Sequence, residues 1–232
     1  MKPHATVIAT LAFGLAGAAQ AQEADFGLSA GLKVWNTQWT TFGYDTNGGG
    51  QQVVTQVPAK DKTVLIPQLS VRYRSIVASL SRYQPTDHDF VAGGSNRRKE
   101  LDVNVGYLVT PAVAVTLGYK QVGQSDGIDN YELAGAVLGA SATAPLGGGF
   151  ALYGSFGFGR MKDTAASTVK FDADYRLTEL GLAYSLPLDR WLKALTFTAG
   201  WRTQVLSSKQ ALGDQDGRDL TQGLALAVLA SF

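Results

Sequence analysis

Cysteine is absent from this chain of 232 residues, and only one histidine, His88, follows residue 21. Without cysteine, the chain has neither disulfides nor thiolate metal sites. No stretch after residue 21 approaches the roughly 18 consecutive apolar residues that a membrane-spanning helix needs. Charge is also scarce, with 17% charged residues and a formal net charge of +1. A nearly neutral chain argues against nucleic acid as a partner. We find no cofactor motif and no metal-ligand spacing, so we expect no cofactor and no bound metal.

The first 21 residues have the pattern of a secretory signal. Lys2 and His4 precede an apolar run over 5–19, and Ala19-Gln20-Ala21 forms a small-residue cleavage site. The run is short for an N-terminal membrane anchor. The sequence therefore predicts a cleaved signal peptide over 1–21 and a single domain over 22–232. Removal of Lys2 leaves that domain with balanced charge.

Beyond the signal, apolar side chains alternate with small or polar ones. In the clearest segment, Leu101, Val103 and Val105 alternate with Asp102 and Asn104. A period of two places the two sets on opposite faces of a strand. The facing of the segment over 131–144 stays ambiguous, because both sets there are small. The pattern predicts ten strands, over about 26–35, 63–74, 76–83, 100–109, 112–120, 131–144, 150–159, 179–186, 195–202 and 223–232.

The connections between these strands alternate in length. Short joints lie at 75, 110–111, 145–149 and 187–190, and longer polar joints at about 40–62, 84–98, 121–130, 160–174 and 203–220. Tight turns at the end with both termini and longer loops at the other end are typical of outer-membrane barrels, and not of a soluble β-sandwich. We predict an all-β, antiparallel, up-and-down transmembrane β-barrel of ten strands. Eight strands is the alternative, if two weak segments are merged.

The last ten residues, GLALAVLASF, place Leu224, Leu226, Val228 and the terminal Phe232 on one strand face. With the loop pattern, this ending resembles small, porin-like outer-membrane β-barrels of Gram-negative bacteria, over nearly the whole domain. The resemblance implies an integral outer-membrane location and an assembly signal at Phe232 that the barrel assembly machinery reads. It also implies contact with outer-membrane lipids and lipopolysaccharide. No motif selects the OmpA and OmpW type or the ten-stranded omptin proteases.

Large aromatic residues fall near the ends of the predicted strands, at two levels. Such girdles mark the two membrane–water interfaces of a barrel. The predicted girdle residues are Tyr73, Tyr107 and Trp191 at the short-turn end, and Tyr119, Tyr131 and Trp201 at the long-loop end.

The inward face consists mostly of glycine, alanine, serine and threonine. About eight strands already give an interior that side chains fill, so ten strands lined by small residues leave space for water, a solute or an inserted loop. The alternative is that small residues only relieve crowding in a curved sheet. Inward charges should pair or stay hydrated, either as a selectivity ring or gate or as a cross-link that stiffens the barrel. The predicted lumen-lining charges are Lys33, Arg72, Arg74, Glu100, Asp102, Lys120, Glu179 and Arg202.

These features predict a narrow passive channel or cavity for small solutes. The alternative is a non-conducting structural or surface-interaction barrel whose outer loops contact lipopolysaccharide or host molecules. A third reading is a loop-based hydrolase or lipid-modifying enzyme that uses His88, which Asp87 and Asp89 flank. Because a lone loop histidine between acids is typically a solvated turn residue, we expect no enzyme. The run 97–99 (Arg-Arg-Lys) is expected to face lipopolysaccharide phosphates.

Overall fold

The computed structural model describes residues 26–125, 127, 130–164, 172–188, 191–212 and 215–232, so the predicted signal peptide lies outside the described residues. The described chain is built from strands, and none of it forms a helix that is long and apolar enough to cross a membrane. The strands are β1 (Phe26–Thr46), β2 (Gln52–Pro58), β3 (Lys62–Tyr73), β4 (Ile76–Asp89), β5 (Ser95–Thr110), β6 (Val113–Ser125), β7 (Asn130–Gly147), β8 (Phe150–Asp163), β9 (Ala173–Pro187), β10 (Ala194–Leu212) and β11 (Gln215–Ser231).

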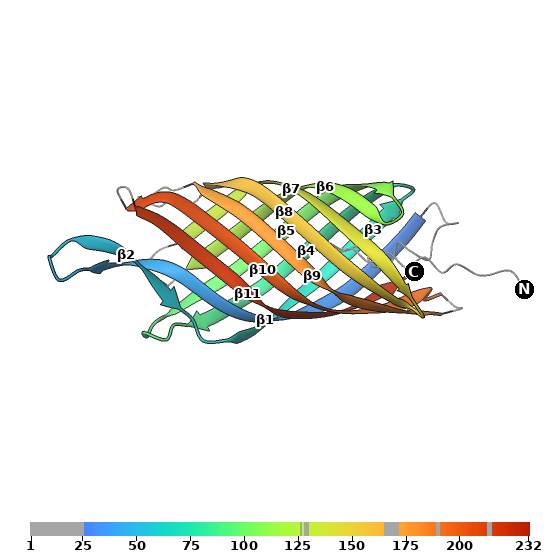
Figure 1. The fold of residues 1–232 in the computed structure, drawn as a ribbon, viewed down its shortest axis with the longest axis horizontal. Helices are drawn as coiled ribbons and strands as arrows, with labels where there is room; N and C mark the ends of the chain where they lie inside the picture. The colour runs from blue at the N-terminus through green and yellow to red at the C-terminus, as the bar shows by residue number, and fades with distance from the viewer. Residues whose placement is uncertain (1–25, 126, 128–129, 165–171, 189–190, 213–214) are drawn as a thin grey trace, which may run out of the picture.

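Ten of these strands form one closed antiparallel sheet. Each strand pairs with its neighbour in sequence from β3 to β11, and β1 pairs with β3 on one side and with β11 on the other. The tilted strands wrap around a single lumen, and the start of β1 and the end of β11 lie at the same end of the barrel (Figure 1). The predicted ten-stranded barrel is confirmed, and the eight-stranded alternative is wrong.

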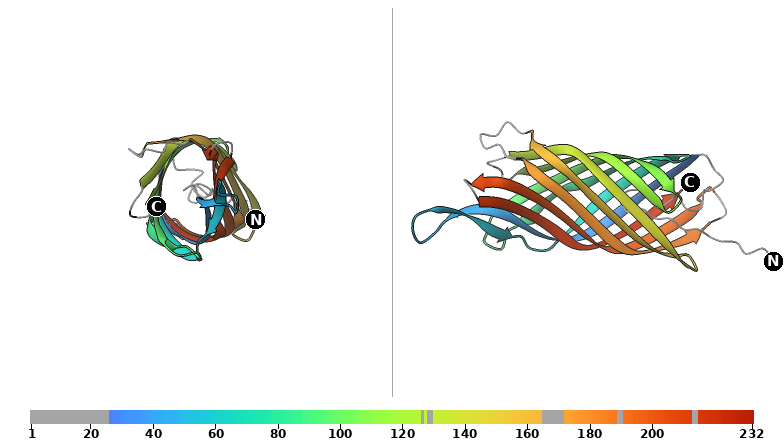
Figure 2. Two further views of the ribbon diagram at one scale, coloured as in Figure 1. Left: turned by 90° about the vertical axis from the view of Figure 1, so that its left-hand side faces the viewer. Right: turned by 45° about the horizontal axis from the view of Figure 1, so that its top comes forward.

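The remaining strand, β2, does not belong to the wall. It pairs with the last part of β1, from Thr40↔Pro58 to Thr46↔Gln52. The resulting β1–β2 hairpin, residues 40–58, extends beyond the barrel at the end opposite the termini, which we call the far end (Figure 1). Seen from the far end, the wall strands form a closed ring and the hairpin lies across part of the opening (Figure 2, left).

Most of the expected long loops are strand instead. β10 continues to Leu212 and β11 begins at Gln215, where a loop over 203–220 was predicted. β4 and β5 likewise stay paired as far as Asp89↔Ser95. Polar residues at these positions hide the apolar alternation, but the backbone ladder satisfies its own hydrogen bonds whether lipid or water surrounds it. Polarity alone therefore does not mark where these strands end.

The alternation of side chains produces an apolar exterior. Leu117 and Leu180 are 58% and 61% exposed, whereas the inward-facing Ala114 and Leu177 are fully buried. A continuous band of exposed leucine, valine and phenylalanine is unusual on a water-soluble protein and is the pattern of a lipid-facing barrel wall.

Five of the six predicted girdle residues lie at least half exposed near the ends of this band, namely Tyr73, Tyr107, Tyr119, Trp191 and Trp201. Tyr131 is the exception. It shares its strand face with the buried Leu133 on β7 and lines a cavity inside the far end. The prediction for Tyr131 was wrong because the facing of β7 is ambiguous in the sequence.

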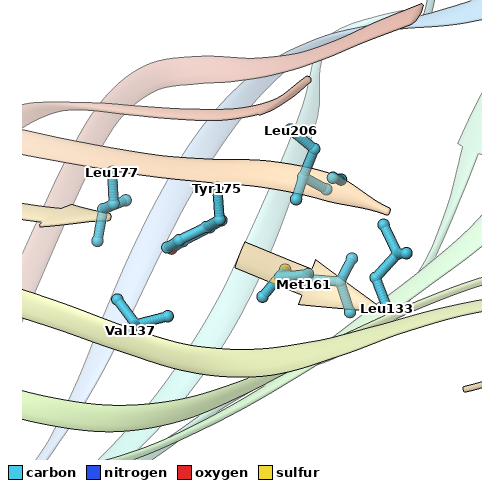
Figure 3. Packing of buried hydrophobic residues seen from close by; sticks show 8 residues of the cluster. Leu133, Val137, Met161, Tyr175, Leu177 and Leu206 are labelled. Atoms are coloured by element: carbon cyan, nitrogen blue, oxygen red, sulfur yellow. The ribbon is translucent and has the colours of Figure 1, made fainter. Parts of the chain in front are cut away.

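Within the barrel, apolar side chains pack together on one part of the inner wall. Figure 3 shows Leu133, Val137, Met161, Tyr175, Leu177 and Leu206 pointing toward a shared centre. They come from β7, β8, β9 and β10, and all are nearly fully buried. This cluster makes one side of the lumen apolar.

Candidate functional site

Charged side chains from opposite walls meet in the lumen and form what we call the ion-paired layer. Four cations and four carboxylates belong to it, and none is more than 7% exposed. Charges this deeply enclosed are stable only when they are paired and hydrogen-bonded. The members of the layer are Lys33, Arg98, Glu100, Asp102, Lys120, Glu179, Arg202 and Asp219.

Glu179 on β9 is the first centre of this layer. Its carboxylate accepts from Lys33 Nζ at 2.8 Å and from Arg202 Nη1 at 2.9 Å. The Tyr153 hydroxyl donates to the other carboxylate oxygen at 3.0 Å. Because Lys33 lies on β1, these contacts tie β1 to the three neighbouring strands β8, β9 and β10.

Glu100 on β5 is the second centre. Its two oxygens lie 2.6 Å from Lys120 Nζ and 2.7 Å from Arg98 Nη2. Lys120 also contacts Asp102 at 2.9 Å. Arg98 reaches across the lumen to Asp219 on β11, where its Nη1 donates at 3.0 Å. The first centre has two cations and one carboxylate and the second has two cations and three carboxylates, so the charges balance only over the two together.

Aromatic rings pack against three of the cations. The Arg202 guanidinium lies 5.1 Å from the Trp35 ring centre, and that of Arg98 lies 5.2 Å from Trp39. Lys120 Nζ lies 5.3 Å from the Tyr175 ring. Cation–π contacts of this kind strengthen when water is excluded. Ion pairs and rings together occupy the lumen at this level and leave the charged side chains no more than 7% exposed.

The sequence placed most of this layer correctly in the lumen but not all of the predicted charges belong to it. Arg72 and Arg74 lie at the terminal end, where Arg72 Nε donates to the Arg74 carbonyl at 2.8 Å. Arg74 occupies the β3–β4 turn with a φ of 54°, and its guanidinium lies 5.3 Å from the outward ring of Tyr73. The expectation that Arg74 lines the lumen is therefore wrong, because the turn rotates its side chain away.

Sequence reasoning also missed Arg98 and Asp219. Arg98 was expected at the lipopolysaccharide surface, yet it is fully buried and faces inward. It has the same parity as Glu100 and Asp102, so extending the alternation of β5 by two residues would have found it. Arg97 and Lys99 have the opposite parity and are exposed.

His88 is buried in β4 and faces the lumen, contrary to the expectation of a solvated turn. Its Nε2 lies 2.7 Å from the Tyr83 hydroxyl, and its ring meets Trp39 edge-on at 5.0 Å. Asp87 points outward instead and pairs with Arg97 at 2.7 Å. A bulge between Tyr83 and Thr86 shifts the register by one residue, which turns both Tyr83 and His88 inward.

His88 lies beyond the apolar band, and burial lowers the pKa of its imidazole to about 4, with the positive charges of Arg98 and Lys62 adding to the effect. The imidazole of His88 therefore stays neutral in the folded protein near pH 6.5, where the same imidazole takes up a proton in the unfolded chain. Stability is expected to fall as the pH drops from about 6.5 toward 4, by at most about 1.4 kcal/mol per pH unit for this one proton.

Urea unfolding of the refolded barrel between pH 7.5 and 4.5 measures this loss. The variant His88→Phe keeps an aromatic ring against Trp39 but cannot titrate, so its stability should vary less over the same range. Parallel pH profiles for the two proteins would show that His88 does not contribute.

A cavity of about 300 Å³ lies between the ion-paired layer and the β1–β2 hairpin. Its walls are mainly apolar and aromatic, with a few polar groups, which is the usual composition of small-molecule sites. Asp219 belongs both to the cavity and to the ion-paired layer, so the two are contiguous. The lining residues are Thr41, Phe42, Gly43, Tyr44, Val57, Phe90, Asn96, Val122, Gln124, Tyr131, Leu133, Leu206, Ser208 and Asp219.

The terminal half of the lumen is different. Small residues line it, as the sequence predicted, and hydroxyl groups pair across neighbouring strands, with Ser29 3.2 Å from Ser231 and Ser185 2.8 Å from Thr196. Among the described residues, no group of three or more histidine, aspartate or glutamate side chains is arranged to hold a metal ion.

Comparison with known proteins gives a fold but no family. Neither a scan of protein-family models nor a search of curated proteins finds a match. Among solved structures, the outer membrane protease OmpT from Escherichia coli has a TM-score of 0.53 and 9% identity, covering 91% of this chain and 100% of that one. The outer membrane protein AlkL has a TM-score of 0.41, 11% identity and 89% coverage of both chains. The toluene transporter TodX of Pseudomonas putida has a TM-score of 0.32 and 10% identity, covering 93% of this chain and 92% of that one. With its closed ten-stranded sheet and apolar exterior, the chain thus has the fold of an outer-membrane β-barrel.

Proposed function

We propose that this protein is an integral barrel of the bacterial outer membrane that admits small solutes into the cavity at its far end. The cavity carries the proposal, because it is an apolar, aromatic-lined space of about 300 Å³ inside the barrel rather than on its lipid-facing wall. Outer-membrane barrels have both termini on the periplasmic side, so the terminal end of this barrel would face the periplasm and the far end the cell exterior.

We infer from the burial of its charges that the ion-paired layer closes the lumen beneath the cavity. Its charges are balanced and buried, so it does not favour ions of one sign. We infer that solute passage requires this layer to rearrange and that ions do not flow through it freely. The alternative, a non-conducting structural barrel, predicts that the lumen stays shut even when the charged side chains of this layer are removed.

Two further roles follow from the exterior. Arg82, Arg97 and Lys99 are exposed on β4 and β5 beyond the apolar band, where lipopolysaccharide phosphates would lie. Phe232 donates its backbone N–H to the Leu28 carbonyl at 2.9 Å, and its ring stacks on Trp191 at 5.4 Å. We propose lipopolysaccharide as the surface partner of these basic residues, and the assembly machinery as the reader of Phe232 before it docks.

The proposal includes no catalytic step. An imidazole that acts as a general base needs access to the proton that it removes. His88 is fully buried, its Nε2 already contacts the Tyr83 hydroxyl, and its pKa is lowered by burial. The geometry supports a packing role for His88 at the base of the far end.

Conductance in planar lipid bilayers tests the function. We expect few or no openings from the wild-type barrel. In a quadruple variant we change four residues to serine, namely Arg98, Glu100, Asp102 and Lys120. This variant loses two cations and two anions, so its net charge is unchanged while large side chains leave the lumen. We expect stable openings from this variant.

The matched control changes the exposed pair Asp87 and Arg97 to serine and should behave as the wild type. Folding of every variant is checked by heat-modifiable gel migration. A folded but silent quadruple variant would contradict a solute path through this layer and favour the non-conducting barrel. A large open pore in the wild type would contradict the closed layer.

A further inference from the structure

The β1–β2 hairpin contributes a large part of the cavity wall. Phe42, Tyr44 and Val57 come from the hairpin, whereas Val122, Leu133 and Leu206 come from the barrel wall below it. Without the hairpin, the cavity would be an open bowl at the mouth of the barrel. The hairpin therefore determines how far the apolar space is shielded from solvent.

Backbone pairing joins the hairpin to the rest of the barrel at its base only, where the Pro58 carbonyl also accepts from Val91 N–H at 3.0 Å. The ladder between β1 and β3 ends at Thr37↔Lys62, and the ladder between β1 and β11 ends at Thr40↔Leu220. Beyond Thr40, β1 pairs with β2 alone. A two-stranded ribbon that continues past its sheet can bend about its base without breaking the ladders of the closed wall.

A small number of contacts hold the hairpin against the tip of β10 and β11. The Tyr44 hydroxyl donates to the Ala211 carbonyl at 2.9 Å. Gln215 bridges to the second strand of the hairpin, accepting from Val54 N at 2.8 Å and donating to the Gln52 carbonyl at 3.3 Å. The Phe42 ring packs against Gly217, where an added Cβ would lie 2.7 Å from the ring.

These contacts are suited to reversible opening. The hydrogen bonds made by Tyr44 and by the Gln215 amide group lie at exposed or partly buried positions, so water can replace each of them. Because residue 217 is glycine, the Phe42 ring packs closely against the backbone there, and no side chain of residue 217 holds the ring in place. Part of the apolar surface of Phe42 and Val57 leaves water when the hairpin packs over the cavity, which favours closure, whereas Tyr44 stays 47% exposed.

We propose that the β1–β2 hairpin is a lid that opens and closes the outer cavity, and that it closes over a small apolar molecule. The lid rests on the proposed function, since it regulates the same cavity. The ligand class follows from the lining, in which four aromatic rings and several aliphatic side chains surround a few polar groups. A closed lid shields such a molecule from water, and an open lid exposes the cavity to the exterior.

The absence of cysteine allows a direct test. Val122→Cys places one thiol on the cavity wall at a position that is 1% exposed, so its reaction with a water-soluble methanethiosulfonate reports opening. We add either Gln215→Ala, which removes the bridge to β2, or Tyr44→Phe, which removes one hydroxyl. Gln215→Ala should accelerate labelling on the order of tenfold, and Tyr44→Phe severalfold, as expected from the loss of two and one hydrogen bonds.

Two controls accompany the measurement. Gln51→Ala removes an exposed glutamine side chain at the hairpin tip and should leave the labelling rate of Val122→Cys unchanged. Val91→Cys, at a position that is 66% exposed, should react equally fast with and without the lid substitutions. Unchanged labelling rates of Val122→Cys in both lid variants would overturn the proposal that the β1–β2 hairpin is a lid.

The ligand is tested separately, with cyclohexane as the probe. Cyclohexane at saturation should slow the labelling of Val122→Cys at least severalfold and leave Val91→Cys unaffected. Acceleration by Gln215→Ala without protection by cyclohexane would support the lid and overturn the apolar ligand, and with it the proposed solute function. Protection without acceleration would overturn the lid and leave the solute function standing.

Discussion

Replacing Gly223 with alanine is expected to prevent the barrel from closing. Gly223 lies on β11 at the junction with β1, with a φ of +148° that side chains rarely adopt. A Cβ at this position would lie 1.8 Å from the Asn36 carbonyl oxygen, which is backbone and cannot move aside. The conformation alone costs about 1–3 kcal/mol for a residue with a side chain. The clash adds to this cost by pushing β1 and β11 apart.

The yield of heat-modifiable, folded protein after refolding into lipid vesicles measures the effect, and we expect it to fall to a minor fraction of the wild-type yield. Gly27→Ala is the matched control, because its added Cβ would meet only Arg72 Cβ at an ordinary 3.9 Å. Similar yields for Gly223→Ala and Gly27→Ala would show that the junction between β1 and β11 tolerates the added methyl group.

The second large effect is expected from Glu179→Gln. This change leaves Lys33 and Arg202 in the lumen without the carboxylate that binds both. Removing one partner of a buried ion pair costs about 3–5 kcal/mol, because the remaining charge has lost its solvation and its counter-charge. We expect a decrease of that size in the free energy of unfolding in urea.

Asp87→Asn provides the comparison, since it breaks an ion pair of similar length whose side chains are 51–62% exposed. Exposed pairs contribute about 0–1 kcal/mol. Adding Lys33→Met and Arg202→Met to Glu179→Gln removes the unpaired charges and should recover part of the loss. Equal effects of Glu179→Gln and Asp87→Asn would mean that water reaches the ion-paired layer.

Much of the fold could be predicted from the sequence, because a period of two fixes the face on which each side chain lies. Lys33, Lys120, Glu179 and Arg202 were predicted to face the lumen for this reason, and the structure brings all four into one layer. Which of them meet was not predictable. Lys33 contacts Glu179 across the lumen through the tilt and stagger of the strands, and local alternation does not encode these quantities.

The predictions from sequence were wrong where a local feature of the backbone changed the alternation of side chains between the two faces of a strand. The bulge between Tyr83 and Thr86 shifts the parity of β4, so a histidine that looks solvated between two acids is buried. The turn at Arg74 rotates its side chain out of the lumen. Beyond the apolar band, polar side chains on both faces hide the alternation, so the far-end strands and the β1–β2 hairpin looked like loops.

The ladder between β1 and β11 has a consequence for how this barrel assembles in the membrane. Every other wall ladder joins strands that are consecutive or, for β1 and β3, separated only by β2, but here Ser29 meets Ser231, 202 positions later. Until that meeting occurs, both outermost strands hold a row of unpaired amide and carbonyl groups, which lipid does not tolerate. A partly assembled sheet exposes these groups to the hydrocarbon unless another protein covers them, so we expect insertion and closure of the sheet to be coupled.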